Sequence, residues 1–170
     1  TRQMGRPISQ AISELKGFKE RADYMLSIAE DKLQNIYLPE KENFKNYIKR
    51  IPMGVYFVIA TWNYPYLTSV NSIIPSLASG NSVILKHSAQ TPLCAEQLFE
   101  AAEKSALPDN VFQYLHLDHA STSKIIAEKP RIFRKHEHRQ QKTQIVSGDV
   151  EKQKLQTKNY YLTIMGIMQQ

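Results

Sequence analysis

The sequence is poor in cysteine, glycine and long hydrophobic runs, and each scarcity excludes a class of protein. A single cysteine, Cys94, excludes an internal disulfide and is typical of a reducing compartment. No apolar run approaches the roughly 18 residues of a membrane span, and the longest, Val55 to Trp62, has the length of a strand. The six glycines form no GxGxxG pattern, so the usual dinucleotide-binding fingerprint is absent. We therefore expect a cytoplasmic protein without a membrane partner. Because the chain begins at Thr1, we also expect an upstream segment, and any targeting leader lies out of view.

The net charge of +6 is unevenly distributed along the 170 residues. Residues 1–130 contain 14 Lys and Arg against 13 Asp and Glu, whereas residues 131–170 contain 8 against 3. The larger part is therefore almost neutral, which argues against nucleic-acid binding by the protein as a whole. Residues 131–170 also hold seven glutamines and show no sustained period of two or 3.6. From this composition we predict that residues 133–170 form a basic, Gln-rich tail of low order.

The first part of the chain predicts a long helix followed by an arm. Pro7 suits the first turn of a helix. Apolar residues follow it at helical spacing, and these are Ile12, Leu15, Phe18, Ala22, Met25, Ala29 and Leu33. Charged residues, including Glu14, Lys19, Glu20 and Lys32, fill the other face. We predict one amphipathic helix over residues 8–33, or two helices broken near Gly17, with the apolar stripe packed in the core. Residues 37–52 contain Pro39 and Pro52, with a mixture of Tyr, Phe, Ile and Lys between them, and predict a hairpin or extended arm.

From residue 55 the pattern predicts alternating strands and helices. Residues 55–60, 82–86 and 111–115 are short, nearly continuous β-prone runs, as expected for strands covered on both faces. Between them, residues 67–79 predict a helix that Gly80 ends, and residues 92–106 a helix that Thr91 caps. This order predicts an α/β fold with a doubly wound, Rossmann-like parallel sheet.

Two strand ends carry the candidate chemistry, because ligands of such sheets bind where the strands end. The first is the aromatic, proline-containing segment from Ile59 to Pro65, and the second runs from Lys86 to Pro92. Taken alone, Asn63 is a turn-forming residue, Lys86 a solvated lysine and Trp62 a packing residue. No metal site is expected from the pattern.

Several ordered blocks resemble the aldehyde dehydrogenase superfamily. They are Pro52-Met53-Gly54-Val55, the segment from Ile59 to Pro65, the segment from Ile74 to Lys86, Gln90-Thr91-Pro92-Leu93, Ala106-Leu107-Pro108 and Met4-Gly5-Arg6-Pro7-Ile8. The resemblance covers residues 3–132, and it implies a partial cofactor-binding domain over residues 1–132. It further implies NAD or NADP as the cofactor, a small aldehyde as the substrate, and a homo-oligomer assembled through the arm at residues 37–52.

The resemblance also assigns roles to individual residues. Asn63 stands where the family places an amide that stabilises the developing oxyanion, a role that a neutral, fixed donor suits. Lys86 matches the lysine that bonds the adenosine ribose. The expected cofactor-binding set is Ile59, Ala60, Thr61, Trp62, Asn63, Lys86, Ser88 and Ala89. Thr61 replaces a proline or alanine, and Ala89 replaces a glutamate that binds ribose hydroxyls, so NADP+ is not excluded. His87 is unusual, and we expect a helix-entry residue rather than a catalyst.

The rest of the family's chemistry is absent from the sequence. In the family a cysteine thiolate attacks the aldehyde, hydride passes to NAD(P)+, and a glutamate-activated water releases the acid. The Phe-Thr-Gly-Ser turn, the Glu-Leu-Gly-Gly segment and the nucleophilic cysteine do not occur here. Cys94 has no partner in sequence that would stabilise a thiolate, so we expect a buried structural thiol.

Three hypotheses follow. The leading one is an N-terminal portion of an aldehyde dehydrogenase that is inactive alone, with residues 133–170 from a shifted reading frame or unspliced sequence. The alternative is a non-catalytic interaction subunit of an aldehyde dehydrogenase oligomer. A nucleic-acid-binding tail on an inactive domain is disfavoured, since the basic residues are barely interleaved with aromatics.

Overall fold

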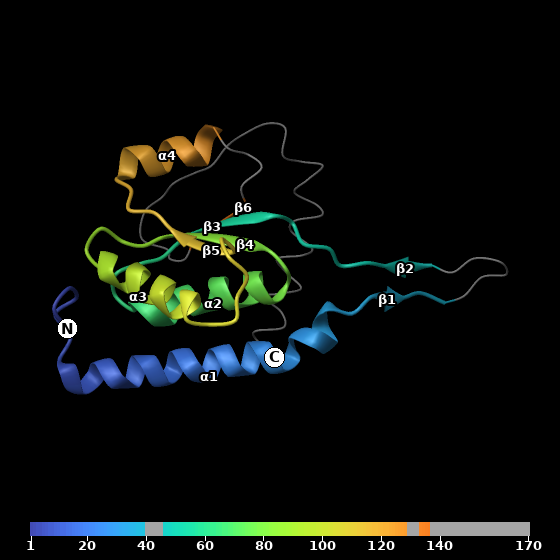
Figure 1. Cartoon of the computed structure of the whole chain (residues 1–170), viewed down its shortest axis with the longest axis horizontal. Helices are drawn as coiled ribbons and strands as arrows, with labels where there is room; N and C mark the ends of the chain where they lie inside the picture. The colour runs from blue at the N-terminus through green and yellow to red at the C-terminus, as the bar shows by residue number, and fades with distance from the viewer. Residues whose placement is uncertain (40–45, 129–132, 137–170) are drawn as a thin grey trace. The chain divides into compact units, whose positions relative to one another are not determined.

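The computed structural model describes residues 1–39, 46–128 and the backbone of 133–136, which form an α/β fold (Figure 1). The tail that we predicted to be of low order lies, beyond residue 136, outside the described residues. The helices are α1 (Ile8–Leu33), α2 (Pro65–Ala78), α3 (Pro92–Glu103) and α4 (His119–Glu128). The strands are β1 (Ile36–Tyr37), β2 (Tyr47–Ile48), β3 (Val55–Ile59), β4 (Ser82–Lys86), β5 (Phe112–Tyr114) and β6 (Phe133–His136).

The main sheet has four parallel strands in the order β5-β4-β3-β6. The chain winds outward from β3 through β4 to β5, and then returns to the other side of β3 as β6. Figure 1 shows α2 and α3 on one face of this sheet and α4 on the other, so the sheet is doubly wound as predicted. The winding direction reverses between β3 and β6, and such a switch point is where ligands of open α/β sheets bind. Strand β6 had been assigned to the tail, and α4 had not been predicted.

The first helix is unbroken and runs along α2 on the side away from the sheet (Figure 1). Gly17 lies at a close approach between the two helices, since a Cβ atom there would stand 3.2 Å from Cδ1 of Leu67. A glycine at this position therefore serves packing and does not break the helix. Ala22 and Met25 are buried against the body of the protein.

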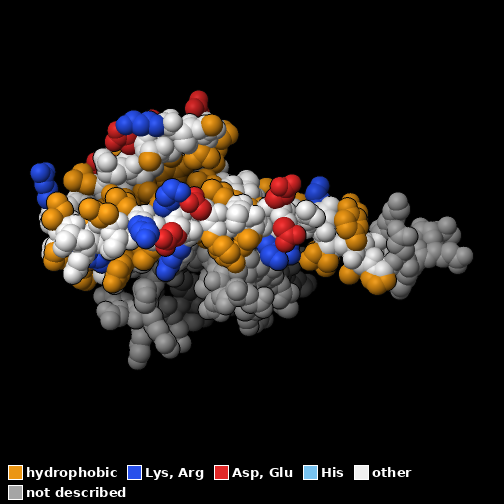
Figure 2. All heavy atoms as spheres, turned by 90° about the horizontal axis from the view of Figure 1, so that it is seen from below, with side chains coloured by type: hydrophobic (Ala, Val, Ile, Leu, Met, Phe, Trp, Pro, Cys, Tyr) orange, Lys and Arg blue, Asp and Glu red, His pale blue; other side chains and the backbone are white. Residues whose placement is uncertain are grey.

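The predicted apolar stripe of α1 is only partly covered. Ile12 is 72% exposed and Leu15 is 53% exposed, so the expectation that both pack in the core was wrong. Ile12 and Leu15 lie on the same side of the helix as Ile8 and Leu26, because these residues are separated by close to whole numbers of helical turns. Figure 2 shows hydrophobic side chains along α1, interrupted by charged ones.

The segment expected to be a hairpin arm, residues 37–52, contains β2 and the second residue of β1, and these two strands pair antiparallel in a sheet of their own. The rings of Tyr37 and Tyr47 lie 5.8 Å apart across this pair. Both tyrosines are largely exposed, at 75% and 52%. The pair of strands extends away from the main sheet (Figure 1), and its two tyrosines are exposed to solvent.

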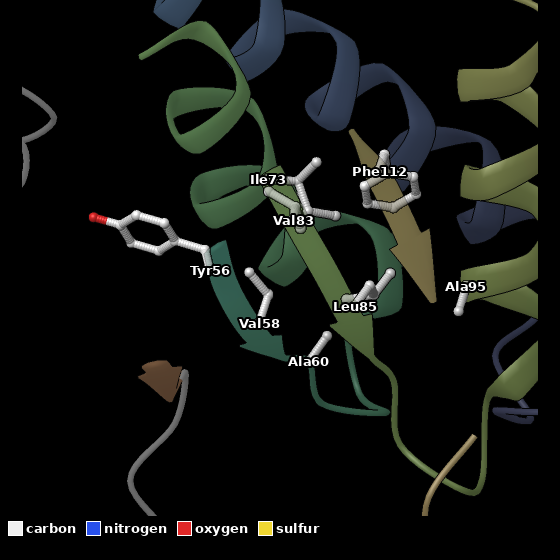
Figure 3. Packing of buried hydrophobic residues seen from close by; sticks show 8 residues of the cluster. All are labelled: Tyr56, Val58, Ala60, Ile73, Val83, Leu85, Ala95 and Phe112. Carbon is white, nitrogen blue, oxygen red and sulfur yellow. The ribbon is translucent and has the colours of Figure 1, made fainter. Parts of the chain in front are cut away.

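The core lies between the sheet and the helices α2 and α3. Side chains from β3, β4 and β5 gather against Ile73 of α2 and Ala95 of α3, as Figure 3 shows. The buried cluster consists of Tyr56, Val58, Ala60, Ile73, Val83, Leu85, Ala95 and Phe112. Val58 and Leu85 are register partners in adjacent strands, so the core packs against β3 and β4 at the same level.

A buried asparagine ties the end of α2 to the start of β3. Gly80 has a φ of +81° and ends the helix as expected from the sequence. Asn81 accepts hydrogen bonds at Oδ1 from the backbone amides of Met53, at 2.6 Å, and Gly54, at 3.0 Å. Its Nδ2 donates to the carbonyl oxygen of Ser76 at 3.1 Å. The residue thus holds the chain segment that leads into β3.

We expect Asn81→Ala to lower the free energy of unfolding by about 2 to 4 kcal/mol, because two backbone amides lose their acceptor. Chemical denaturation of the purified chain measures this change. Asn46→Ala is the matched control, since Asn46 lies exposed in the arm. Equal stabilities for the two variants would show that the Asn81 bonds contribute nothing.

Candidate functional site

The two strand ends singled out in the sequence lie side by side at one edge of the sheet. Ile59 and Lys86 are register partners in parallel strands, and the amide of Ala60 donates to the carbonyl oxygen of Lys86 at 3.0 Å. The loops that follow β3 and β4 therefore start from the same point. This point adjoins the switch between β3 and β6, where a doubly wound sheet binds its ligand.

The side chain of Asn63 is held by its neighbour in the loop after β3. The hydroxyl of Thr61 donates to Oδ1 of Asn63 at 2.9 Å. Within the part of the chain that the structure describes, Nδ2 of Asn63 has no hydrogen-bond partner. The hydroxyl of Thr61 thus bonds to the amide oxygen of Asn63, and the NH2 group of Asn63 is available as a donor.

Lys86 is the last residue of β4, and most of the residue is buried. The residue is only 4% exposed, and among the described residues no carboxylate or carbonyl oxygen pairs with its ammonium group. Burial lowers the pKa of Lys86 below its usual value, since desolvation disfavours the charged form. Hydroxyl or phosphate oxygens of a group bound at this edge can accept hydrogen bonds from the ammonium.

The other predicted site residues differ in accessibility. Ala60 is buried, Ile59, Thr61 and Ser88 are half-buried, and Ala89 is exposed. Trp62 is 47% exposed and does not belong to the core cluster, so core packing does not account for it. Ile59 and Ala60 can therefore serve a ligand mainly through their backbone, and Trp62 through its ring.

His87 links the two loops across the edge. Its Nε2 donates to the carbonyl oxygen of Pro65 at 2.9 Å. Its Nδ1 accepts from the amide of Ser88, at 3.0 Å, and from the hydroxyl of Thr91, at 2.9 Å. These partners require the neutral ring with its proton on Nε2. Thr91 stands at the start of α3 as predicted, but its hydroxyl bonds to His87 and does not cap the helix.

We predict that this histidine makes stability pH-dependent. Burial lowers the pKa of His87 below the ordinary value of about 6.5, Lys86 and His116 lower it further, and Pro65 and Glu14 raise it. As the pH falls, His87 therefore takes up a proton in the unfolded chain at a higher pH than in the folded chain. Stability is largest above pH 6.5 and falls as the pH drops toward the lower folded value, by at most about 1.4 kcal/mol per pH unit.

Unfolding measured between pH 7.5 and 5.5 tests this dependence. His87→Gln should flatten the profile relative to the unsubstituted chain. His119→Gln, which removes an exposed histidine, should leave the profile unchanged. A profile that is the same in all three proteins would contradict the assignment.

The loop after β3 is also held from outside the sheet. Arg6 donates from Nη2 to the carbonyl oxygen of Asn63 at 2.9 Å, and its guanidinium lies 4.2 Å from the ring centroid of Tyr64. Its Nη1 donates to Oε2 of Glu14 at 2.7 Å. Oε1 of Glu14 accepts from the amides of Tyr66, at 2.9 Å, and Leu67, at 3.1 Å. Glu14 is only 6% exposed, so its placement on the charged face of α1 was wrong.

Comparison with known proteins identifies the family. The sequence model of the aldehyde dehydrogenase family matches residues 1–134. The chain belongs to the aldehyde dehydrogenase family. The resemblance stated for residues 3–132 is thereby confirmed.

Solved structures show the same fold. A NAD-dependent aldehyde dehydrogenase from Sinorhizobium meliloti is 26% identical with a TM-score of 0.71, and the match covers 76% of this chain and 26% of that one. A succinic semialdehyde dehydrogenase from Streptococcus pyogenes, solved with NADP+, is 25% identical with a TM-score of 0.69, covering 76% and 28%. A betaine aldehyde dehydrogenase variant from Staphylococcus aureus, solved with NAD+, shares the fold at 23% identity and a TM-score of 0.69, covering 76% and 26%. The chain spans about a quarter of the length of these proteins.

The one cysteine of this aldehyde dehydrogenase chain is a buried thiol. Cys94 lies in α3 and is 9% exposed. Burial raises the pKa of Cys94, although a hydrogen bond from the Tyr66 hydroxyl opposes the shift. The pKa of Tyr66 is itself raised to about 12, chiefly by burial. The thiol is therefore protonated at neutral pH, as expected for a structural residue.

Among residues 1–39, 46–128 and 133–136, no three His, Cys, Asp or Glu side chains gather closely enough to hold a metal ion. None of the helices found in those ranges has the length and hydropathy to span a membrane.

The roles of Arg6 and Glu14 in this aldehyde dehydrogenase chain were not predicted from the sequence. Arg6 was noted only as part of a block that resembles the family. Glu14 was classed by its charge, although its spacing from Phe18, Ala22 and Met25 places it on the buried face of α1. A carboxylate among apolar residues at helical spacing is the signal that could have identified it.

Proposed function

We propose that this chain is the first part of a cytoplasmic, homo-oligomeric NAD(P)+-dependent aldehyde dehydrogenase that oxidises a small aldehyde to a carboxylic acid. In this proposal it contributes one side of the cofactor site and the oxyanion donor. The observation that carries the proposal is the register of Ile59 with Lys86, which brings both matching motifs to one edge of the sheet. The relatives from Streptococcus pyogenes and Staphylococcus aureus, solved with NADP+ and NAD+, support the cofactor class.

The residues at this edge fit a dinucleotide. Lys86 presents an ammonium group with no described partner, and a ribose hydroxyl is an acceptor that it can bond. Ser88 is half-buried beside it, and the exposed Ala89 offers no carboxylate that would repel a 2′-phosphate. When bound, NAD(P)+ supplies the acceptor for the hydride of the aldehyde.

Asn63 is suited to stabilise negative charge that develops on an aldehyde oxygen. Its amide Nδ2 is a neutral donor, and Thr61 holds the opposite end of the amide. A donor fixed before the reaction needs no reorganisation when charge appears, and the loss of one such donor costs about 3 to 4 kcal/mol of transition-state stabilisation. Trp62 adjoins this donor and offers a half-exposed ring to the bound molecule.

We further propose that the chain is inactive by itself. The nucleophilic cysteine and the general-base glutamate of the family have no counterpart in the 170 residues. The proposed origin of residues 133–170 is a shifted frame or unspliced sequence. The nucleotide sequence downstream of codon 132 tests this origin: a frame that encodes Phe-Thr-Gly-Ser supports it, and its absence argues against it.

A second candidate function is that of a non-catalytic subunit that joins full-length copies of the enzyme. The exposed tyrosines of the arm, Tyr37 and Tyr47, favour it because aromatic side chains are enriched in protein interfaces. Co-expression with a complete aldehyde dehydrogenase of the same organism tests this role. Co-purification that Tyr37→Ser and Tyr47→Ser abolish would support it.

The proposed site is tested in an enzyme that joins residues 1–132 to the catalytic continuation encoded downstream. Asn63→Ala should lower kcat by roughly 100-fold to 1000-fold with little change in the KM for cofactor. Lys86→Ala should raise the KM for cofactor more than it lowers kcat. Lys104→Ala, at an exposed position in the same fold, is the control. Equal kinetics for all the variants would contradict both assignments.

A further inference from the structure

We infer that Arg6 and Glu14 form a clamp that sets the position of the Asn63 loop and so positions the oxyanion donor. The clamp is defined by these two side chains and their bonds to residues 63–67. Its effect on catalysis rests on the proposed function, but its effect on the loop does not. Neither side chain has a described contact with the free amide group of Asn63, so both are positioning residues.

Arg6 holds the loop on the side that precedes α2. Its guanidinium donates to the carbonyl oxygen of Asn63 and lies over the ring of Tyr64, so one planar group fixes two consecutive residues. The same guanidinium donates to Glu14 through its other terminal nitrogen. The fork geometry of arginine allows this double attachment, which a lysine cannot reproduce.

Glu14 holds the loop on the other side, at the first turn of α2. The amides of Tyr66 and Leu67 lie where an α-helix has no carbonyl partners of its own. Oε1 of Glu14 accepts from both, and a carboxylate at a helix N-terminus is further stabilised by the helix dipole. The helix has no side-chain cap from its own N-cap residue, Tyr64, so Glu14 supplies the cap from α1.

Arg6 and Glu14 form an ion pair with each other, and together they bond to the backbone at both ends of the loop. Both side chains are largely buried, at 11% and 5% exposure, so water competes little for their bonds. His87 holds the carbonyl oxygen of Pro65 between them. The backbone from residue 63 to residue 67 is thus fixed by three side chains, while Nδ2 of Asn63 has no hydrogen-bond partner among the described residues. Fixed backbone around a free donor is the arrangement that a pre-organised oxyanion site requires.

Trp62 reports on this loop because it is the one tryptophan of the chain. We expect Arg6→Gln and Arg6→Lys to raise the acrylamide quenching constant of Trp62 about twofold, since release of the loop exposes the other half of the indole. Arg2→Gln, an exposed arginine in the same segment, should leave quenching unchanged. Circular dichroism confirms that each variant remains folded.

Amide exchange provides a second measurement that needs no arginine variant. In the unsubstituted chain, the amides of Tyr66 and Leu67 should exchange at least roughly tenfold slower than unprotected amides. Glu14→Ala should remove this protection while the strand amides of Val58 and Leu85 keep theirs. Exchange of the Tyr66 and Leu67 amides at the unprotected rate in the unsubstituted chain would overturn the clamp. Folded Arg6 variants in which acrylamide quenches Trp62 as it does in the unsubstituted chain would also overturn it. Since no cofactor or aldehyde is added, a failure here is distinct from a failure of the proposed function.

Discussion

A purified polypeptide of these 170 residues is expected to form no NAD(P)H from aldehyde and NAD(P)+. The only thiol is that of Cys94, which is buried and has a pKa raised by that burial. Asn63 and Lys86 can orient and stabilise groups, but neither can form the covalent adduct. Removal of a nucleophile from an enzyme that acts through one lowers turnover roughly a million-fold, so activity should fall below detection.

Absorbance at 340 nm with a panel of small aldehydes measures this result, and the enzyme with the catalytic continuation is the positive control. Cys94 should also react slowly with a thiol reagent in the folded chain and rapidly in denaturant. Robust turnover by the 170-residue chain that Cys94→Ser abolishes would contradict both the assignment of Cys94 and the proposed function.

The largest change in stability is expected for Glu14→Ala, at about 3 to 5 kcal/mol. The substitution leaves the buried guanidinium of Arg6 without its counter-charge, and it leaves the amides of Tyr66 and Leu67 without an acceptor. Breaking one side of a buried pair costs more than the pair contributes, because the remaining charge stays desolvated. Glu14→Gln should cost less, since its amide oxygen can still accept from the two backbone amides.

Glu20→Ala is the matched control for Glu14. Glu20 lies on the same helix with a side chain that is 66% exposed, and it faces Lys16 at 3.8 Å. An exposed pair of this kind contributes about 0.5 kcal/mol or less. Denaturant unfolding of the three variants compares them directly. A Glu14→Ala protein that is as stable as Glu20→Ala would show that the buried network does not hold α1 to α2.

The strands of the site were predictable because each consists of a continuous run of β-prone residues. Residues 55–59 and 82–86 are continuous β-prone runs, which only a sheet covered on both faces accommodates, and both strands form there. Once both are parallel, their carboxyl ends must share an edge. The meeting of Ile59 with Lys86 therefore followed from pattern and topology.

Side-chain networks were less predictable, because residue type was taken as a guide to exposure. Glu14 was placed in solvent, yet its two oxygens serve a guanidinium and a helix terminus that lies more than 50 residues away in sequence. Thr91 was expected to cap α3, but His87 lies within reach and accepts its hydroxyl. Both errors arise from partners that are adjacent only after folding.

The sequence pattern was weakest for α4 and β6, the last two elements that the structure describes. Strand β6, with the sequence Phe-Arg-Lys-His, has no apolar pattern of its own. Its place in the sheet comes from backbone pairing with β3, in which Tyr56 to Ile59 align with residues 133–136. Helix α4 has one buried residue, Thr122, so its sequence lacks a wide apolar face. Tertiary context supplies what the local pattern does not show.

The central claim is that the edge formed by the ends of β3 and β4 binds NAD(P)+, and a titration followed by NMR tests it most directly. NAD+ and NADP+ are added separately to the isotope-labelled 170-residue chain up to tens of millimolar. We expect saturable shifts confined to residues 59–63 and 86–89, with a Kd in the millimolar range or weaker because this edge is only one side of the site. Lys86→Ala should abolish the shifts. Absence of any change at residues 59–63 and 86–89, or saturable changes elsewhere in the chain, would contradict the account.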